Sequence, residues 1–253
     1  MTPIPSRLRE PPTASKQAIR ISLGTLLLSE RRTTRAVRAT VKDASDRLVG
    51  ETVNHHRLRD TAAIMLILSA SKRLATDIET ALHAAKAAAW EAGARRLEVE
   101  LRAAGAWEAA KRVRTTYSAA KDIQAATTAE SVALVWRQRA IYAVQKALRE
   151  DAEVASALRG LALSVEANVT RAAATESAQA YDGGHVDGAS DLGEYADFVI
   201  LDRWDAMLDA CSACRTLDGD LTLVGEPFPS GDEPSYKHPR CRCSRTTITL
   251  PRN

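Results

Sequence analysis

The chain has 253 residues, of which 45% are hydrophobic and 26% charged, and its formal net charge is +3. This composition can bury the core of one or two domains and argues against disorder throughout. The longest uninterrupted apolar run, residues 62–68, is far shorter than the roughly 20 residues that a membrane-spanning helix needs. Residues 1–12 lack the apolar stretch of a signal peptide, so we expect a cytoplasmic protein without a membrane partner.

The charge is unevenly distributed along the chain. Residues 1–150 hold 26 Lys and Arg against 15 Asp and Glu, a balance of +11, whereas the remainder holds 9 against 17, a balance of −8. A basic half can bind nucleic acid or an acidic partner, although a solvated surface would look the same. Aromatic residues are only 4% and do not interleave with the basic ones, so a base-stacking platform is not supported.

The first 160 residues read as helical. All nine prolines lie at positions 3–12 or 227–251, and residues 13–226 contain none. Because loops and turns recruit proline, so long a proline-free stretch favours helices. Apolar residues such as Ile67, Leu74 and Ile78 fall on one helical face. We therefore predict a disordered tail over 1–12 and a helical interaction or assembly region over 13–160, with about five long amphipathic helices in the chain.

Local signals indicate where these helices end. Glycines suggest breaks around residues 50–56 and 93–105, and the sequence Thr127-Thr-Ala-Glu130 has the form of a capping box. The last helix is predicted over about Asp151–Tyr181. The Asp-Gly-Gly sequence at 182–184 would then terminate it, as glycine just past a helix commonly does.

The character of the sequence changes after residue 193. Segments 198–201, 221–224 and 246–250 are rich in β-branched and apolar residues and are predicted to be short strands. Three such strands bury too little apolar area to hold a sheet alone, so a metal would be physically useful there. The predicted fold class is mainly α, with long helices followed by a small α+β zinc-stapled domain over 161–253.

All four cysteines lie in the last 43 residues. They form two close pairs, Cys211 with Cys214 and Cys241 with Cys243, and His238 precedes the second pair. Two thiol pairs joined by a loop can surround one tetrahedral zinc ion, using four cysteines or three cysteines with the histidine. Four protein ligands would close the site and make the metal structural. Two disulfides are the alternative.

Signatures of catalytic chemistry are missing from the sequence. A zinc deaminase needs His-x-Glu upstream of Pro-Cys-x-x-Cys, but Ala210 precedes the first cysteine and no histidine begins His-x-Glu. The sequence also lacks His-Glu-x-x-His, a phosphate-binding glycine loop and a nucleophile-elbow motif. We therefore expect a protein that is not an enzyme.

The cysteine region has a recognisable order of motifs. It reads Trp204-Asp-Ala-Met-Leu-Asp209-Ala-Cys-Ser-Ala-Cys, then Leu217-Asp-Gly219, then His238-Pro-Arg-Cys-Arg-Cys. This resembles the carboxy-terminal domain of phage head morphogenesis proteins, the Mu F-like minor head proteins. Upstream, Thr175-Glu176 is similar to the Thr-Glu helix segment of that family, and the resemblance covers about residues 165–250.

The resemblance implies a minor head protein that acts in capsid or prohead assembly near the portal. Expected partners are portal, capsid or scaffold proteins, with packaged DNA on the basic half and an oligomeric state. The expected location is the virion or prohead, after the host cytoplasm. Residues expected to support the metal domain, through core packing, turns or a buried hydrogen bond, are Trp204, Asp209, Asp218, Gly219, Thr175 and Glu176.

Two other functions remain open at this point. One is an enzyme or toxin-like effector that carries the head-morphogenesis module for packaging or delivery, since residues 13–160 match no named motif. The other is a DNA-binding protein that uses the basic helical half, with Arg31, Arg32 and Arg35 as candidates for phosphate contacts.

Overall fold

A computed structural model describes residues 13–53, 60–190, 192, 198–206, 210–234, 241 and 243–251. Contacts divide the chain into two compact units. Unit 1 comprises residues 1–30, 86–117 and 175–253, and unit 2 comprises residues 31–85 and 118–174. The units interleave along the chain because three long helices contribute residues to both. The predicted domain boundaries at residues 12 and 160 remain a prediction.

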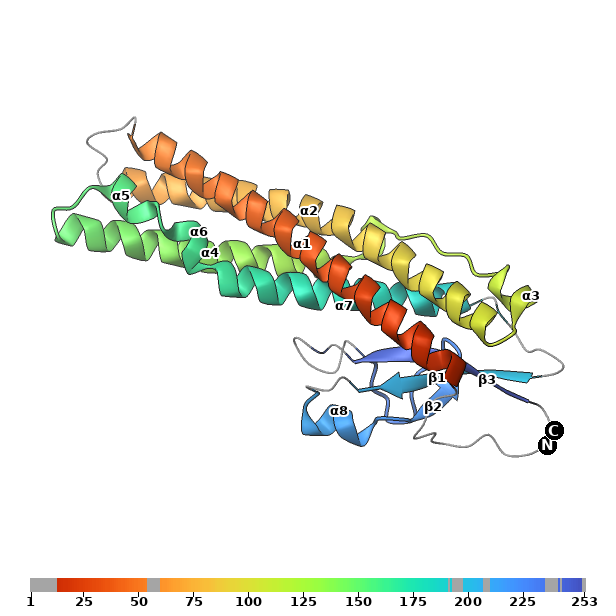
Figure 1. The fold of residues 1–253 in the computed structure, drawn as a ribbon. Helices are drawn as coiled ribbons and strands as arrows, with labels where there is room; N and C mark the ends of the chain where they lie inside the picture. Colours follow the sequence, from red (N-terminus) through yellow and green to blue (C-terminus); the bar gives the residue numbers. More distant parts are fainter. Residues whose placement is uncertain are drawn as a thin grey trace. The chain divides into compact units, whose positions relative to one another are not determined.

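The described part of the chain is mainly helical (Figure 1). No helix among the described residues has the length and apolar character needed to cross a membrane. A small three-stranded sheet lies near the carboxy terminus, so the predicted fold class, mainly α with a small α+β part, is confirmed. The elements are α1 (Thr13–Val53), α2 (Asp60–Ala103), α3 (Trp107–Ala110), a 3-10 turn (Ala119–Lys121), α4 (Ile123–Arg149), α5 (Val154–Leu158), α6 (Leu161–Ser164), α7 (Glu166–Ala189), β1 (Phe198–Asp205), α8 (Ser212–Thr216), β2 (Leu221–Leu223) and β3 (Ser244–Pro251).

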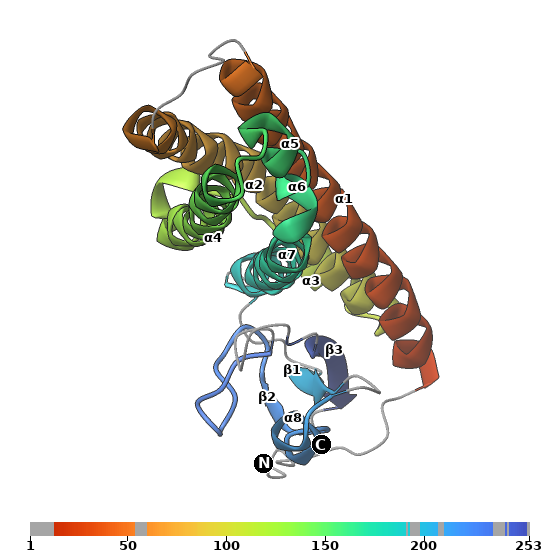
Figure 2. The ribbon, with the colours of Figure 1, turned by 90° about the vertical axis from the view of Figure 1, so that its left-hand side faces the viewer.

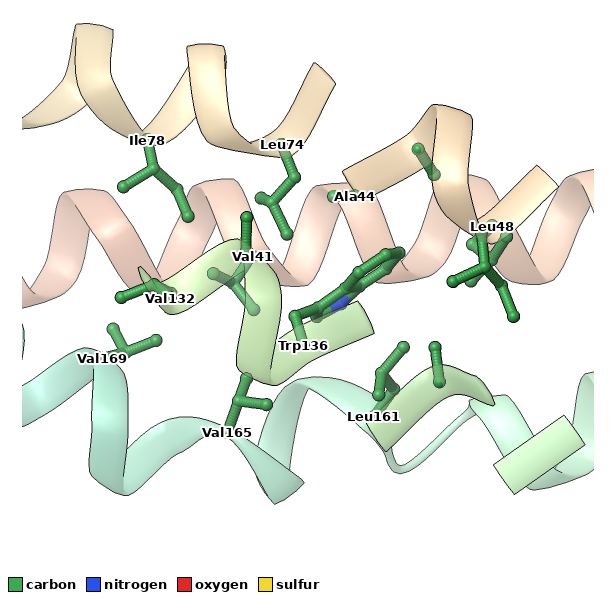
Figure 3. Packing of buried hydrophobic residues seen from close by; sticks show 14 of the residues in the cluster. Val41, Ala44, Leu48, Leu74, Ile78, Val132, Trp136, Leu161, Val165 and Val169 are labelled. Atoms are coloured by element: carbon green, nitrogen blue, oxygen red, sulfur yellow. The ribbon is translucent and has the colours of Figure 1, made fainter. Parts of the chain in front are cut away.

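Unit 2 is held by one apolar core. Side chains from α1, α2, α4, α5, α6 and α7 meet around Trp136, which is fully buried (Figure 3). The indole N–H of Trp136 donates to the hydroxyl of Ser45 at 3.0 Å, so its one polar atom is satisfied inside the core. Leu74 and Ile78, which the sequence places on one helical face, both belong to this cluster.

The breaks predicted around residues 50–56 and 93–105 are confirmed, because α1 ends at Val53 and α2 continues through Gly93 to end at Ala103. Other predicted helix boundaries are wrong. Helix α4 begins at Ile123 rather than at Thr127, because the side chain of Asp122 caps it by accepting a hydrogen bond from the N–H of Ala125 at 3.2 Å. The predicted helix over 151–181 is divided into α5, α6 and α7, and α7 runs on to Ala189.

Two of the glycines that suggested helix ends, Gly93 and Gly184, are contact points between helices instead. A Cβ at Gly93 of α2 would lie 1.9 Å from the carbonyl oxygen of Tyr181 in α7. A Cβ at Gly184 of α7 would lie 1.9 Å from the carbonyl oxygen of Trp90 in α2. Only a residue without a side chain permits this approach of the two backbones. The glycines are therefore explained by the crossing of α2 and α7 within unit 1.

The sheet of unit 1 is antiparallel, in the order β2-β1-β3 (Figure 2). Strand β1 pairs with β3 over eight residue positions, from Phe198 opposite Pro251 to Asp205 opposite Ser244. The shorter β2 pairs with the middle of β1, with Leu201 opposite Leu223. The three strands predicted from the sequence are present, and β1 and β3 are longer than predicted. Their ends bring the two cysteine segments together.

Candidate metal centre

Three cysteine sulfurs converge beside the sheet. The Sγ atoms of Cys214, Cys241 and Cys243 all lie within 4.8 Å of one another, and all three residues are buried. Cys214 lies in α8, while Cys241 and Cys243 lie in the segment that leads into β3. No other group of three potential ligands is found among the described residues. The two cysteine motifs, 27 residues apart in the sequence, therefore meet at one point.

The first cysteine of the pair lies at the edge of this group. Cys211 is exposed and occupies the N-cap position of α8, where its sulfur accepts a hydrogen bond from the backbone N–H of Cys214 at 3.4 Å. Such amide-to-sulfur hydrogen bonds stabilise a thiolate, because the N–H dipole points at the negative charge. The turn thus directs Cys211 and Cys214 toward the same region.

Aromatic side chains form the floor of the centre. Trp204 of β1 is fully buried and packs with Phe228 edge to face, with 5.2 Å between ring centroids. Both belong to the apolar cluster that contains the three buried cysteines. The indole N–H of Trp204 has no hydrogen-bond acceptor among the described residues.

The Leu-Asp-Gly motif builds the turn between α8 and β2. Gly219 has φ +88°, a conformation that side-chain-bearing residues rarely adopt. Its N–H donates to the carbonyl of Trp204 at 2.9 Å, which ties the turn to β1. The carboxylate of Asp218 accepts a hydrogen bond from the N–H of Ala206 at 2.9 Å. The motif therefore fixes the chain on both sides of the first cysteine pair.

Ionisation of the buried thiols is unfavourable in the absence of a cation. Burial raises the pKa of Cys214 to about 12, and the hydrogen bond with Cys211 and the neighbouring Cys241 act in the same direction. Ionised thiols packed this closely repel one another, and a divalent cation bound between them removes that penalty.

The distances agree with a tetrahedral sulfur site. Zinc–sulfur bonds of about 2.3 Å place neighbouring sulfurs of a tetrahedron about 3.8 Å apart. The Sγ atoms of Cys214 and Cys241 are 3.8 Å apart. A disulfide requires about 2.05 Å, and none of the four cysteines forms a disulfide in the structure. The chain thus presents buried cysteines that could bind a metal, as the sequence indicated.

The remaining predicted site residues are located as follows. His238 and Asp209 lie outside the described residues. Thr175 and Glu176 lie in α7, and the carboxylate of Glu176 forms a buried ion pair with Lys86 of α2, with 2.5 Å between Nζ and Oε2. This partner belongs to a helix and not to the cysteine loops.

A second buried cluster in unit 1 was not anticipated from the sequence. Arg245 of β3 contacts two carboxylates, Asp202 of β1 at 3.1 Å and Asp182 of α7 at 3.2 Å, and also pairs with Glu233. The other oxygen of Asp202 lies 3.0 Å from Nε2 of His185. These contacts join α7 to the sheet. Arg245 is also 5.3 Å from the ring centroid of Phe228, so this cluster adjoins the floor of the cysteine centre.

Opposing effects set the protonation of this cluster. Burial alone raises the pKa of Asp202, but His185 and Arg245 outweigh it and hold that pKa well below its usual range. Burial dominates at Asp182 and raises its pKa, although Arg245 acts against it. One sequence signal could have indicated the cluster. Asp202 and Arg245 are charged residues directly beside segments that are otherwise typical of buried strands.

Comparisons with known proteins give no match. No family model matches the chain, and neither a curated protein nor a solved structure matches it.

Proposed function

We propose that this chain is a phage minor head protein that acts in capsid or prohead assembly near the portal, without enzymatic activity. One observation supports this most directly. The residues that resemble the Mu F-like domain are spread over two cysteine motifs, and Cys214, Cys241 and Cys243 of those motifs form one buried group. Trp204 and Gly219, which belong to the same resemblance, form its floor and its adjoining turn.

We further propose that the centre holds one structural zinc ion. Cys214, Cys241 and Cys243 would supply three ligands, and the fourth would be Cys211 or His238. A zinc ion supplies folding free energy on the order of 10 kcal/mol or more, by analogy with zinc-finger peptides. Side chains and a backbone turn also support the centre. The Gly219 turn holds α8 against β1, and the Trp204–Phe228 pair packs in the same apolar cluster as the three buried cysteines.

Metal analysis of the purified protein tests this centre. We expect about one zinc per chain, and we expect Cys214→Ser to lose it. The variants Cys211→Ser and His238→Ala distinguish the fourth ligand, because only the true ligand lowers zinc affinity strongly when it is replaced. Protein that is fully folded, metal-free and resistant to chelator would contradict the proposal.

The assembly role needs a test in particles. Deletion of the gene from the phage genome that carries it is expected to give heads that are defective in assembly or packaging. Complementation with the wild-type gene should restore them, and complementation with Cys214→Ser should not. In wild-type particles the protein should be present in purified virions or proheads. Normal, infectious, fully packaged particles that lack the protein would refute the role.

A further inference from the structure

The second half of α4 carries an unbalanced set of positive charges. Residues 137–149 contain four basic side chains and no acidic one, and the one acidic residue of α4 is Glu130, near the other end. Three of the four basic residues, Arg139, Lys146 and Arg149, are exposed. Tyr142 lies between them and is 60% exposed.

These residues form one stripe on the helix. Arg139, Tyr142, Lys146 and Arg149 follow one another at intervals of three, four and three residues, which keeps them on one face. At a rise of 1.5 Å per residue the stripe is about 15 Å long. The opposite face of α4, which includes Trp136, Ala140 and Val144, lies in the core of unit 2. Packing in that core therefore fixes which side chains face outward.

The basic residues of the stripe have no acidic partner among the described residues, and the same holds for Arg31, Arg32, Arg35 and Lys72 of α1 and α2. Other exposed basic residues of these two helices are paired with carboxylates. Lys42 pairs with Asp46 at 2.5 Å, and Arg73 pairs with Glu51 at 3.2 Å. Arg95 likewise pairs with Glu91 at 3.4 Å. The stripe therefore carries positive charge that no carboxylate of the described residues neutralises.

Helix electrostatics explains only part of the stripe. The negative end of the helix dipole favours cations in the last turn, which accounts for Lys146 and Arg149. The dipole effect decays within that turn, so it does not account for Arg139. It also gives no reason for an exposed tyrosine between the cations. Gln138 and Gln145, which flank Tyr142 on the exposed face, add further hydrogen-bonding groups.

We propose that this stripe, Arg139–Tyr142–Lys146–Arg149, binds the phosphate backbone of duplex DNA. Arginine, lysine, tyrosine and glutamine are the side chains that commonly contact phosphate oxygens. A straight row of cations about 15 Å long matches the regularly spaced charges of a duplex. Single-stranded nucleic acid would call for several stacking rings, and the stripe has one aromatic side chain. The inference is independent of the metal centre and of the assembly role.

Binding of the full-length protein to a short fluorescent duplex tests the proposal, measured as a function of salt. Replacement of Arg139, Lys146 and Arg149 by Gln removes three phosphate contacts. Because each contact contributes roughly 0.9 to the slope of log K against log[salt], we expect the slope to fall in magnitude by about 2.7. Between 50 and 200 mM salt the wild-type affinity should then drop about 40-fold more than that of the variant. Tyr142→Ala should weaken binding without changing the slope.

Two further triple variants with the same change in net charge serve as controls. Replacement of Lys42, Arg73 and Arg95 by Gln removes exposed cations that are paired with carboxylates, and it should leave the slope nearly unchanged. Replacement of Arg31, Arg32 and Arg35 by Gln removes exposed cations of α1 outside the stripe, and it should also have little effect. Circular dichroism confirms that each variant is folded.

Several outcomes would overturn the proposal. One is the absence of duplex binding at 50 mM salt. Another is an equal loss of DNA affinity in the stripe variant and in the paired control. A third is a larger loss of DNA affinity in the α1 variant than in the stripe variant. Tighter binding of single-stranded DNA than of duplex would also contradict it. Competition by polyglutamate as effective as that by duplex DNA would assign the stripe to an acidic protein partner instead.

Discussion

The two units of this protein bury different kinds of side chain. Around Trp136, unit 2 buries Val, Leu, Ile and Ala from six helices, and its buried polar residues are hydroxyl-bearing ones such as Ser45. Unit 1 buries ion pairs, a histidine and three cysteines within and beside a three-stranded sheet. All charged side chains that are buried among the described residues belong to unit 1.

This difference goes with how the apolar side chains of each unit are arranged. Long helices in unit 2 bring continuous apolar faces together in one cluster, so the hydrophobic effect can stabilise them without additional ionic links. Unit 1 divides its buried apolar residues among four smaller clusters and adds specific polar links between helix, strand and loop. Such links are directional and depend on every partner being present. A single substitution in unit 1 should therefore affect stability locally, and to an extent that depends on pH and on bound metal.

Loss of the proposed metal should have the largest effect, and this effect should be confined to unit 1. A strong chelator, or Cys214→Ser, is expected to remove a contribution on the order of 10 kcal/mol from the cysteine centre. Hydrogen exchange should then show loss of protection in β1 and β3 while α4 keeps its protection. An exposed serine replaced by alanine, such as Ser131→Ala in α4, provides the control. Equal loss of protection in both units would contradict this separation.

Truncation of the central tryptophan tests the apolar core of unit 2. Trp136→Ala removes a fully buried ring and its hydrogen bond to Ser45, and it should lower the free energy of unfolding by about 3–5 kcal/mol. Tyr142→Ala on the outer face of the same helix should change it by no more than about 0.5 kcal/mol. Urea denaturation followed by circular dichroism measures both. Similar losses of stability in the two variants would contradict the burial of Trp136 in the core and the exposure of Tyr142.

The helix crossing of unit 1 can be tested with a single methyl group. Gly184→Ala would place a Cβ against the backbone of Trp90, so the helices must move apart, at a cost of about 1–3 kcal/mol. Gly50→Ala meets no atom within 4 Å and lies inside α1, so it should stabilise the protein by up to about 1 kcal/mol. Thermal unfolding should therefore shift in opposite directions for the two variants. A shift in the same direction would contradict the close contact.

The smallest expected effect is a pH dependence in the buried ion cluster. The pKa of Asp202 is lowered in the folded protein, so its ionic contribution is complete above the unfolded value of about 3.9 and is lost as pH falls below it. The difference in stability between wild type and Asp202→Asn should accordingly shrink between pH 5 and pH 3. Asp46→Asn, which alters an exposed pair, should show little such change. A difference that is constant with pH would contradict the assigned charge state.

Sequence patterns predicted the elements that depend on neighbouring residues in the chain. Apolar spacing located Leu74 and Ile78 in the core, and β-branched runs located the three strands. The pattern failed where glycine served a tertiary contact, since Gly93 and Gly184 look like helix ends but permit helices to cross. The pattern also predicted an N-cap at Thr127, but the N-cap of α4 is Asp122, because its carboxylate accepts a hydrogen bond from the Ala125 N–H.

For the candidate site, spacing alone singled out the cysteines, because thiols in close pairs are rare and have few roles. The sequence by itself thus determined that this protein is mainly helical, with a cysteine-rich end and a small sheet. Only the tertiary structure decided that Cys214, Cys241 and Cys243 share one buried point, that Arg245 joins α7 to the sheet, and that the stripe on α4 faces outward. Those outcomes depend on contacts between residues far apart in the chain, and local preferences do not encode them.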